Sequence, residues 1–275
     1  MKKLLIGVLT AVALLMVPDR AEGLGVAVSV LPQAYFVERI GGPAVEVTVM
    51  IPPGANPAIF EPTVAGLSRL ARAEVYIKVG HSHFPFEAAW LPRLLSVNPD
   101  LRVIDSSAGL SLDPEDPHIW LSPKRARAQA MNIYSGLAET DPGNSAEYER
   151  NLNILLADID KLDREIADLL APARGRRFMV YHPAWGYLAE DYGLGQLVIE
   201  AEGHEPGPSR LSDLISEARR SGVKVILIQP QFSRRSAEVV ARETGCRLIE
   251  ADPLAGDWAV NLKSVARRLA TALSN

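Results

Sequence analysis

Cysteine is almost absent from this chain of 275 residues. Cys246 is the only one, so no disulfide can form within the chain, and a cluster of thiolate ligands is excluded. Its surroundings, ETGCRLI, look like the start of a strand, where a lone cysteine usually serves as a small buried hydrophobe. Histidine and carboxylate side chains are therefore the candidate metal ligands of this chain.

Long hydrophobic runs are also lacking beyond the first few residues. The one apolar run, at 4–17, follows a basic start and holds fourteen residues, fewer than the roughly 20 that a membrane helix needs. This pattern predicts a secretory signal peptide over residues 1–22, with cleavage within DRAEG at 19–23. An uncleaved membrane anchor is the alternative. We expect the mature chain in the periplasm or another extracytoplasmic compartment.

A basic surface is missing as well. Lys and Arg number 29 against 33 Asp and Glu, which gives a formal net charge of −4. No stretch interleaves basic with aromatic residues, whereas proteins that bind nucleic acid concentrate positive charge on one face. The composition therefore argues against a nucleic-acid partner.

What the chain does contain is a regular alternation of strand-like and helical segments. Eight short runs are rich in Val and Ile and have Gly or Pro near many of their ends. They lie at 26–31, 45–51, 75–79, 101–105, 177–181, 196–200, 223–228 and 247–251. Helical patterns separate them, and those at 210–222 and 233–245 both end on a glycine, as a helix C-cap would. Strand–helix alternation predicts an α/β fold with mainly parallel sheets.

One long helix divides this pattern in two. The stretch 145–171 contains no Gly or Pro, and its apolar residues recur at alternating spacings of four and three, which places them on one helix face. They are Tyr148, Leu152, Leu155, Ile159, Leu162, Ile166 and Leu169. A helix of this length spans roughly 40 Å at 1.5 Å per residue.

The long helix falls between four early strands and four late ones. We therefore predict two similar α/β lobes joined by one backbone helix, with a ligand cleft between the lobes. The N-terminal lobe is expected at 23–142, the linking helix at 143–173 and the C-terminal lobe at 174–275. The alternative is a single α/β domain, above all a (β/α) barrel.

The five histidines share one kind of position, because none falls inside a predicted strand or helix. They are His81, His83, His118, His182 and His204. Four follow predicted strands, His118 precedes a helix that begins near Pro123, and Asp252 follows the last strand. Loops at the carboxyl ends of parallel strands open into the cleft where α/β proteins bind ligands. A lone loop histidine more often forms a hydrogen bond or cap, but imidazoles and a carboxylate gathered there suit zinc or manganese.

Five strings of the sequence carry a resemblance to a known family. They are PPGANPAIFEPT at 52–63, DPHIWLSP at 116–123, YHPAWGYLAEDYGL at 181–194, PQFSRRSAEVVARETG at 230–245 and ADPLAGDW at 251–258. In order and spacing, the chain resembles the solute-binding proteins of zinc- and manganese-type ABC importers, whose two lobes are joined by one long helix. The resemblance covers essentially the whole chain after the predicted signal peptide.

The resemblance implies metal ligands at three positions, His118, His182 and Asp252. It also implies Zn²⁺, with Mn²⁺ or another divalent metal as alternatives, and a membrane permease of an ABC importer as the partner. A receptor of this kind catalyses no reaction, so we expect no enzymatic activity. We expect the protein to be a monomer.

One family position differs in this chain. The family usually has a histidine where NPAIFEP has Ala58. His83 or His81, in a loop that borders the cleft in the family, is the expected replacement, with a slight preference for His83. Glu61, which follows in the same string, is expected to support the site from outside the ligand shell. His204, on the opposing lobe, is expected either to do the same or to be a fifth metal donor, with Glu202 beside it to fix its tautomer.

Two other functions are compatible with the sequence. In the first, the same fold carries an altered site that binds another metal or ligand, or that acts as a metal chaperone. In the second, the His-x-His pair begins the site of a zinc-dependent hydrolase, with an open coordination position for water. No general base is placed beside the pair, which disfavours the hydrolase.

Overall fold

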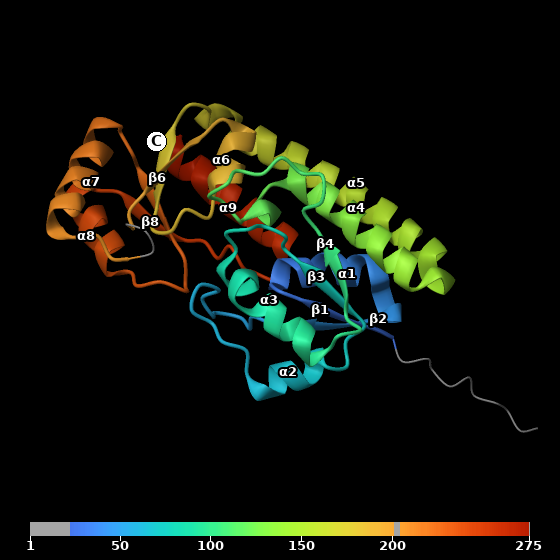
Figure 1. The fold of residues 1–275 in the computed structure, drawn as a ribbon. Helices are drawn as coiled ribbons and strands as arrows, with labels where there is room; N and C mark the ends of the chain where they lie inside the picture. Colours follow the sequence, from blue (N-terminus) through green and yellow to red (C-terminus); the bar gives the residue numbers. More distant parts are fainter. Residues whose placement is uncertain (1–22, 201–203, 275) are drawn as a thin grey trace, which may run out of the picture.

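A computed structural model describes residues 23–200 and 204–274 (Figure 1). The predicted signal peptide at 1–22 and Glu202 lie outside the described residues. Within the described part of the chain, no helix is long and apolar enough to cross a membrane.

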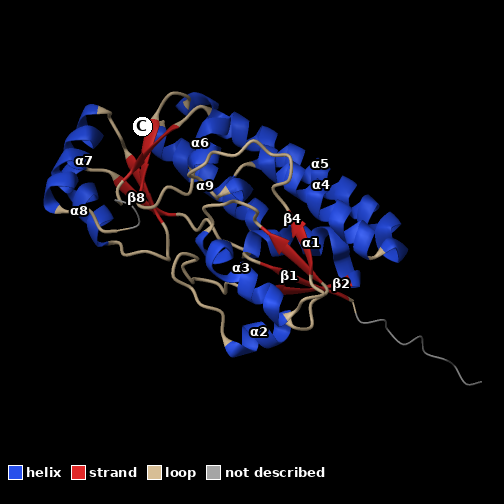
Figure 2. Cartoon of the chain, viewed as in Figure 1, coloured by secondary structure: helices blue, strands red, loops and turns tan. Residues whose placement is uncertain are grey.

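All eight predicted strands are present, and they form two open sheets (Figure 2). The strands are β1 Leu24–Val28, β2 Val45–Val49, β3 Val75–Lys78, β4 Arg102–Asp105, β5 Arg177–Val180, β6 Gly195–Val198, β7 Val225–Ile228 and β8 Arg247–Glu250. Their orders are β2-β1-β3-β4 and β6-β5-β7-β8, and each strand pairing is parallel. The prediction of two similar α/β lobes with parallel sheets is confirmed, and the barrel alternative is wrong because the strands close no ring.

Helices connect and cover the strands. They are α1 Leu31–Gly41, α2 Val64–Leu70, α3 Pro85–Val97, α4 Pro123–Thr140, α5 Ser145–Leu170, α6 Gly186–Tyr192, α7 Pro208–Arg220, α8 Arg235–Thr244 and α9 Trp258–Leu273. Helix α8 ends on Gly245 in the left-handed conformation, with a φ of 73°, as the sequence predicts. In each sheet the chain moves outward on one side of the first strand and then crosses to its other side. The points at which the strand order reverses lie between β1 and β3 and between β5 and β7, and the loops after these four strands flank them.

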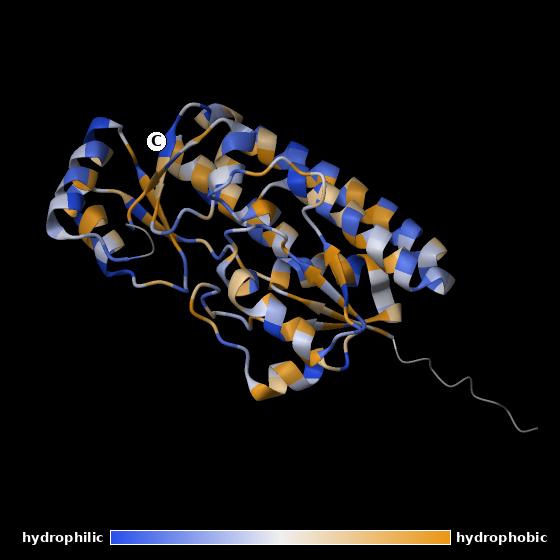
Figure 3. Ribbon diagram, viewed as in Figure 1, coloured by the Kyte–Doolittle hydropathy of each residue, from blue (hydrophilic) through white to orange (hydrophobic). Residues whose placement is uncertain are grey.

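Helix α5 runs past both sheets and packs along α4 (Figure 1). Its buried residues follow the predicted spacing as far as Ile166, and hydrophilic and hydrophobic patches alternate along it in Figure 3. The final position differs, because Leu170 is buried and Leu169 only half-buried. A helix of 3.6 residues per turn drifts from a strict seven-residue repeat, so the buried face moves on by the last turn.

The two lobes share more than the long helix. Helix α9, from the end of the chain, packs on α5, and its first residue, Trp258, reaches α1 of the other lobe. The Trp258 ring lies 5.0 Å from Phe36 between centroids, and its indole N–H donates to the Trp120 carbonyl at 2.6 Å. The Trp120 N–H in turn donates to the Pro253 carbonyl at 2.7 Å. One continuous core of buried residues therefore joins the two sheets. The lobe limits at 142 and 173 stay a prediction.

Candidate metal centre

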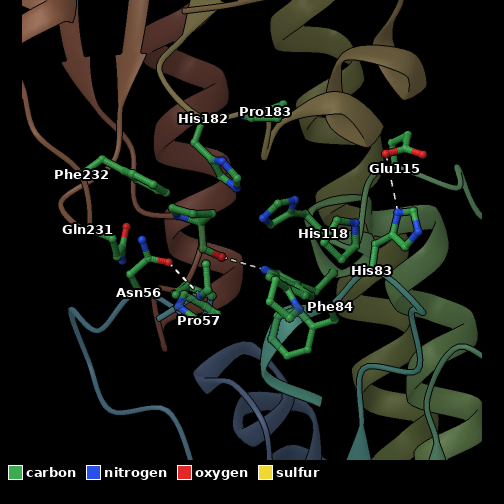
Figure 4. A pocket seen from close by; sticks show the side chains of 16 residues that line it. Asn56, Pro57, His83, Phe84, Glu115, His118, His182, Pro183, Gln231 and Phe232 are labelled. Atoms are coloured by element: carbon green, nitrogen blue, oxygen red, sulfur yellow. Dashed lines mark hydrogen bonds and ion pairs between the residues drawn. The ribbon is translucent and has the colours of Figure 1, made fainter. Parts of the chain in front are cut away.

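Loops from both lobes line one open cleft of about 150 Å³ at the carboxyl ends of the strands. Six of its lining residues are Ala58, His83, Phe84, His118, His182 and Phe232. Figure 4 shows the His118 and His182 side chains pointing toward one another across this space. Their ring centroids lie 5.2 Å apart. The structure thus brings together two histidines that are 64 positions apart in the sequence.

His118 is held by a carboxylate behind it. Its Nδ1 lies 2.7 Å from Asp116 Oδ1, and its backbone N–H donates to the same oxygen at 2.9 Å. Burial lowers the pKa of His118, and the hydrogen bond to Asp116 only partly opposes this. The imidazole is therefore neutral near pH 7, with its proton on Nδ1 and the lone pair of Nε2 available. A metal ligand needs this form.

His182 is oriented in the same way from the other lobe. Its Nδ1 lies 2.9 Å from Glu200 Oε1, which again assigns the proton to Nδ1. The Phe232 ring stacks on the imidazole, with centroids 4.8 Å apart and planes at 24°. The Gln229 side chain fixes the backbone, since it accepts from the His182 N–H at 3.3 Å and donates to its carbonyl at 2.8 Å.

The sequence interpretation missed both orienting carboxylates. Asp116 stands two residues before His118 in DPHIWLSP, a spacing that could have identified it. Gly186 permits its approach, since a Cβ there would lie 2.6 Å from Asp116 Oδ2. Glu200 ends a predicted strand and is buried, and its Oε2 has no hydrogen-bond partner among the described residues. Nothing local to Glu200 indicates that its partner is 18 residues away.

His81 and His83, the adjacent pair, have different surroundings. His81 is buried at 5% exposure, and its Nδ1 accepts the His83 backbone N–H at 3.1 Å. Its Nε2 must then carry the proton and donate to the Asp113 carbonyl at 2.8 Å. Both nitrogens of His81 are engaged, which leaves no lone pair for a metal. His83 lines the cleft with a half-exposed ring, and its Nδ1 lies 3.6 Å from Glu115 Oε2 (Figure 4).

A buried carboxylate fixes the loop that carries this pair. Glu87 accepts hydrogen bonds from the backbone N–H groups of Val79 and Gly80, at 2.6 and 3.0 Å, and from the Ser29 hydroxyl. Gly80 has a φ of +85°, and a Cβ there would collide with Asp105, so only glycine fits. Burial raises the pKa of Glu87, while its hydrogen bonds oppose the shift.

Replacing Glu87 by Gln is expected to destabilise the protein by about 2 kcal/mol, because the new NH₂ group would face one of the donors that the carboxylate now accepts. The midpoint of thermal unfolding should fall by roughly 4–8 °C, which differential scanning calorimetry would measure. The matched control is Glu115→Gln, at a side chain that is 82% exposed, which should leave the midpoint unchanged. Equal midpoints for the two variants would contradict the role given to Glu87.

The remaining predicted residues lie outside the cleft lining. Asp252 uses Oδ1 to accept from Gln231 Nε2 at 2.7 Å and from the Leu254 N–H at 2.9 Å, although its neighbour Pro253 lines the cleft. His204 and Glu61 are exposed and do not contact the cleft. Among residues 23–200 and 204–274, no three His, Cys, Asp or Glu side chains are grouped closely enough to hold a metal ion.

The fold and the site define a class: a two-lobed α/β protein with a histidine from each lobe facing a cleft. Residues 26–272 match the family model described as ZnuA, zinc-uptake complex component A, periplasmic. The chain belongs to this family.

Relatives and solved structures agree with this assignment. The high-affinity zinc uptake system protein ZnuA of Bacillus subtilis is 26% identical over 86% of this chain and 81% of its own length. The zinc-binding lipoprotein AdcA of Streptococcus pneumoniae is 24% identical over 86% of this chain, which spans only 51% of that relative. A crystal structure of ZnuA is 41% identical, with a TM-score of 0.88 over 92% of this chain and 100% of the other.

A further structural neighbour is the solute-binding protein FpvC of Pseudomonas aeruginosa, solved with Mn²⁺. It is 27% identical, with a TM-score of 0.79 over 91% of this chain and 98% of that one.

Proposed function

We propose that this protein is an extracytoplasmic receptor that binds a divalent metal, Zn²⁺ foremost, in the cleft between its lobes and delivers it to the permease of an ABC importer. The observation that carries the proposal is the facing pair His118 and His182, each held by a carboxylate at Nδ1. Two imidazoles that face one cleft, each with its Nδ1 held by a carboxylate, are the beginning of a zinc site.

We infer that His83, at the rim of the cleft, and Asp252, beside the lining residue Pro253, supply the further ligands. His83 lines it on the N-terminal lobe, and neither of its ring nitrogens has a hydrogen bond within the described residues, although Glu115 lies near Nδ1. Asp252 could present Oδ2, because only its Oδ1 carries hydrogen bonds from the described side chains and backbone. Zinc accepts such mixed shells of imidazole and carboxylate, and three imidazoles favour zinc over manganese, which prefers oxygen donors.

The names of relatives support the choice of metal. A deletion mutant of ZnuA was solved with zinc bound, and it is 40% identical to this chain with a TM-score of 0.86. FpvC was solved with Mn²⁺, which keeps manganese as the alternative cargo. The family description names the periplasm, which supports the predicted export. We infer no chemical step, and the monomeric state remains a prediction.

Isothermal titration of the mature chain, freed of metal by a chelator, tests this proposal directly. We expect one Zn²⁺ bound per chain, more tightly than Mn²⁺. The control is calorimetric proof that the metal-free chain is folded. If such a chain gave no heat of binding with Zn²⁺ or Mn²⁺ up to millimolar concentration, the metal-receptor function would be contradicted.

The two adjacent histidines offer a second test. His83→Ala is expected to weaken Zn²⁺ binding by about tenfold or more, because it removes an imidazole at the cleft, whereas His81→Ala should change affinity by less than about threefold. His81→Ala should instead lower thermal stability, since its ring bridges the His83 backbone and the Asp113 carbonyl. A larger loss of affinity in His81→Ala, with stability retained, would reverse these roles.

A further inference from the structure

We propose that Gln231 sets the metal preference of this site by restricting Asp252 to a single donor oxygen, which favours Zn²⁺ over Mn²⁺. This inference rests on the proposed function, because it takes Asp252 as the carboxylate ligand beside the three imidazoles of that site. Gln231 is a positioning residue: it acts on the metal through Asp252 and supplies no ligand of its own.

The Asp252 carboxylate uses one of its two oxygens for hydrogen bonds. Oδ1 accepts from Gln231 Nε2 at 2.7 Å and from the Leu254 backbone N–H at 2.9 Å. A carboxylate oxygen offers about two lone pairs, so these two donors occupy those of Oδ1. Oδ2 accepts no hydrogen bond from the described residues. A metal ion in the cleft therefore meets a carboxylate with one available oxygen.

The orientation of the Gln231 amide follows from its partner. An ionised carboxylate only accepts hydrogen bonds, so the amide must turn its NH₂ group toward Asp252 Oδ1. Its own Oε1 is buried and has no hydrogen-bond partner among the described residues. A buried carbonyl without a partner is costly and calls for an explanation. The contact with Asp252 provides one, because it requires the amide in this orientation.

Gln231 belongs to a short segment that supports both proposed ligands of the C-terminal lobe. Its neighbour Phe232 stacks on the His182 imidazole, and both residues of the segment line the cleft (Figure 4). The Asp252 carbonyl accepts from Asn261 Nδ2 at 2.7 Å, which fixes the backbone of this ligand as well. All of these residues follow α5 in the chain, so their contacts do not depend on the other lobe.

The number of donors decides which metal suits the shell. Three imidazoles and one carboxylate oxygen make four donors, the number that zinc prefers in a tetrahedral site. Manganese favours octahedral shells with more oxygen ligands. If Asp252 bound through both oxygens, it would add a fifth donor, and the Gln231 amide prevents this by occupying Oδ1. The hydrogen bond thus favours zinc without adding a ligand.

Gln231→Met tests the proposal, because methionine has a similar length and donates no hydrogen bond. Competition titrations of the mature, metal-free chain with Zn²⁺ and Mn²⁺ give the ratio of the two affinities. We expect the variant to shift this ratio toward Mn²⁺ by about tenfold or more, since one lone pair of Asp252 Oδ1 becomes free. The matched control is Gln129→Met, at a buried glutamine of α4 outside the cleft lining, which should keep the original ratio.

Visible absorption of the chain loaded with Co²⁺ gives a second readout. Four-coordinate cobalt absorbs far more strongly than cobalt with more ligands, so the spectrum reports the number of donors. The unmodified chain and Gln129→Met should show the intense bands. Gln231→Met should show weaker ones, because its carboxylate is free to bind through both oxygens.

The Asp252→Ala background shows whether Gln231 acts through Asp252. Asp252→Ala alone should weaken Zn²⁺ binding, and Gln231→Met added to it should leave the ratio of Zn²⁺ to Mn²⁺ affinity unchanged. If the shift toward Mn²⁺ persisted in the double variant, Gln231 would contact the metal itself. Unchanged Zn²⁺ affinity in Asp252→Ala would remove Asp252 from the shell. Either result would overturn the inference.

The remaining outcomes separate this inference from the proposed function. An unchanged affinity ratio and Co²⁺ spectrum in Gln231→Met, or an equal loss of affinity for both metals, would overturn the selectivity role and leave the metal receptor in place. Absence of binding of Zn²⁺, Mn²⁺ and Co²⁺ by the folded, unmodified chain would overturn the proposed function itself.

Discussion

Replacing His182 by alanine is expected to weaken Zn²⁺ binding by more than about 100-fold. Loss of an orienting carboxylate at a metal site typically costs 10–100-fold in affinity, and loss of the ligand itself should cost more. His182 is the imidazole that the C-terminal lobe provides to the facing pair. It stacks on Phe232 and pairs with Glu200, while His118 faces it from the N-terminal lobe. Without the His182 imidazole, the buried Glu200 also loses its hydrogen-bonding partner.

Competition of the apo-protein against a chromogenic zinc indicator would measure this loss. His204→Ala is the matched control, because His204 is an exposed histidine of the same lobe, away from the cleft. Glu200→Gln should fall between the two, within the 10–100-fold range, since it preserves the ring but no longer fixes the proton on Nδ1. Similar affinities for His182→Ala and His204→Ala would remove His182 from the site.

The largest loss of stability is expected for Trp258→Ala. The Trp258 ring is buried at 2% exposure between the lobes, against Phe36 and Tyr35, and its N–H satisfies the buried Trp120 carbonyl. Truncating a buried tryptophan costs about 3–5 kcal/mol. The midpoint of thermal unfolding should therefore fall by roughly 6–20 °C.

Differential scanning calorimetry of three variants would resolve the packing and hydrogen-bond contributions. Trp258→Phe keeps most of the apolar contact and loses the N–H, so its free energy of unfolding should fall by about 1–3 kcal/mol. Val260→Ala, two residues along α9 at 67% exposure, should leave the midpoint nearly unchanged. If Trp258→Ala unfolded at the same temperature as Val260→Ala, α9 would not hold the lobes together.

Much of the fold could be predicted from sequence because its determinants are local. The Val- and Ile-rich runs located all eight strands, and the alternating spacing from Tyr148 to Ile166 identified the buried face of α5. Periodicity reports which face of an element is buried. It does not report which partner covers that face. The packing of Trp258 against Phe36 in the other lobe therefore had no counterpart in the sequence pattern.

For the candidate site, too, some features were predictable from the sequence and others only from the tertiary structure. The sequence by itself excluded a cluster of thiolate ligands, and it placed the histidines in loops at the ends of strands and before helices. Only the tertiary structure paired His118 with His182, assigned Asp116 and Glu200 to them, and separated His83 at the cleft from His81, whose nitrogens are both engaged. The physical reason is that a hydrogen bond depends on distance and direction between side chains, and parallel strands bring together loops that the sequence keeps far apart.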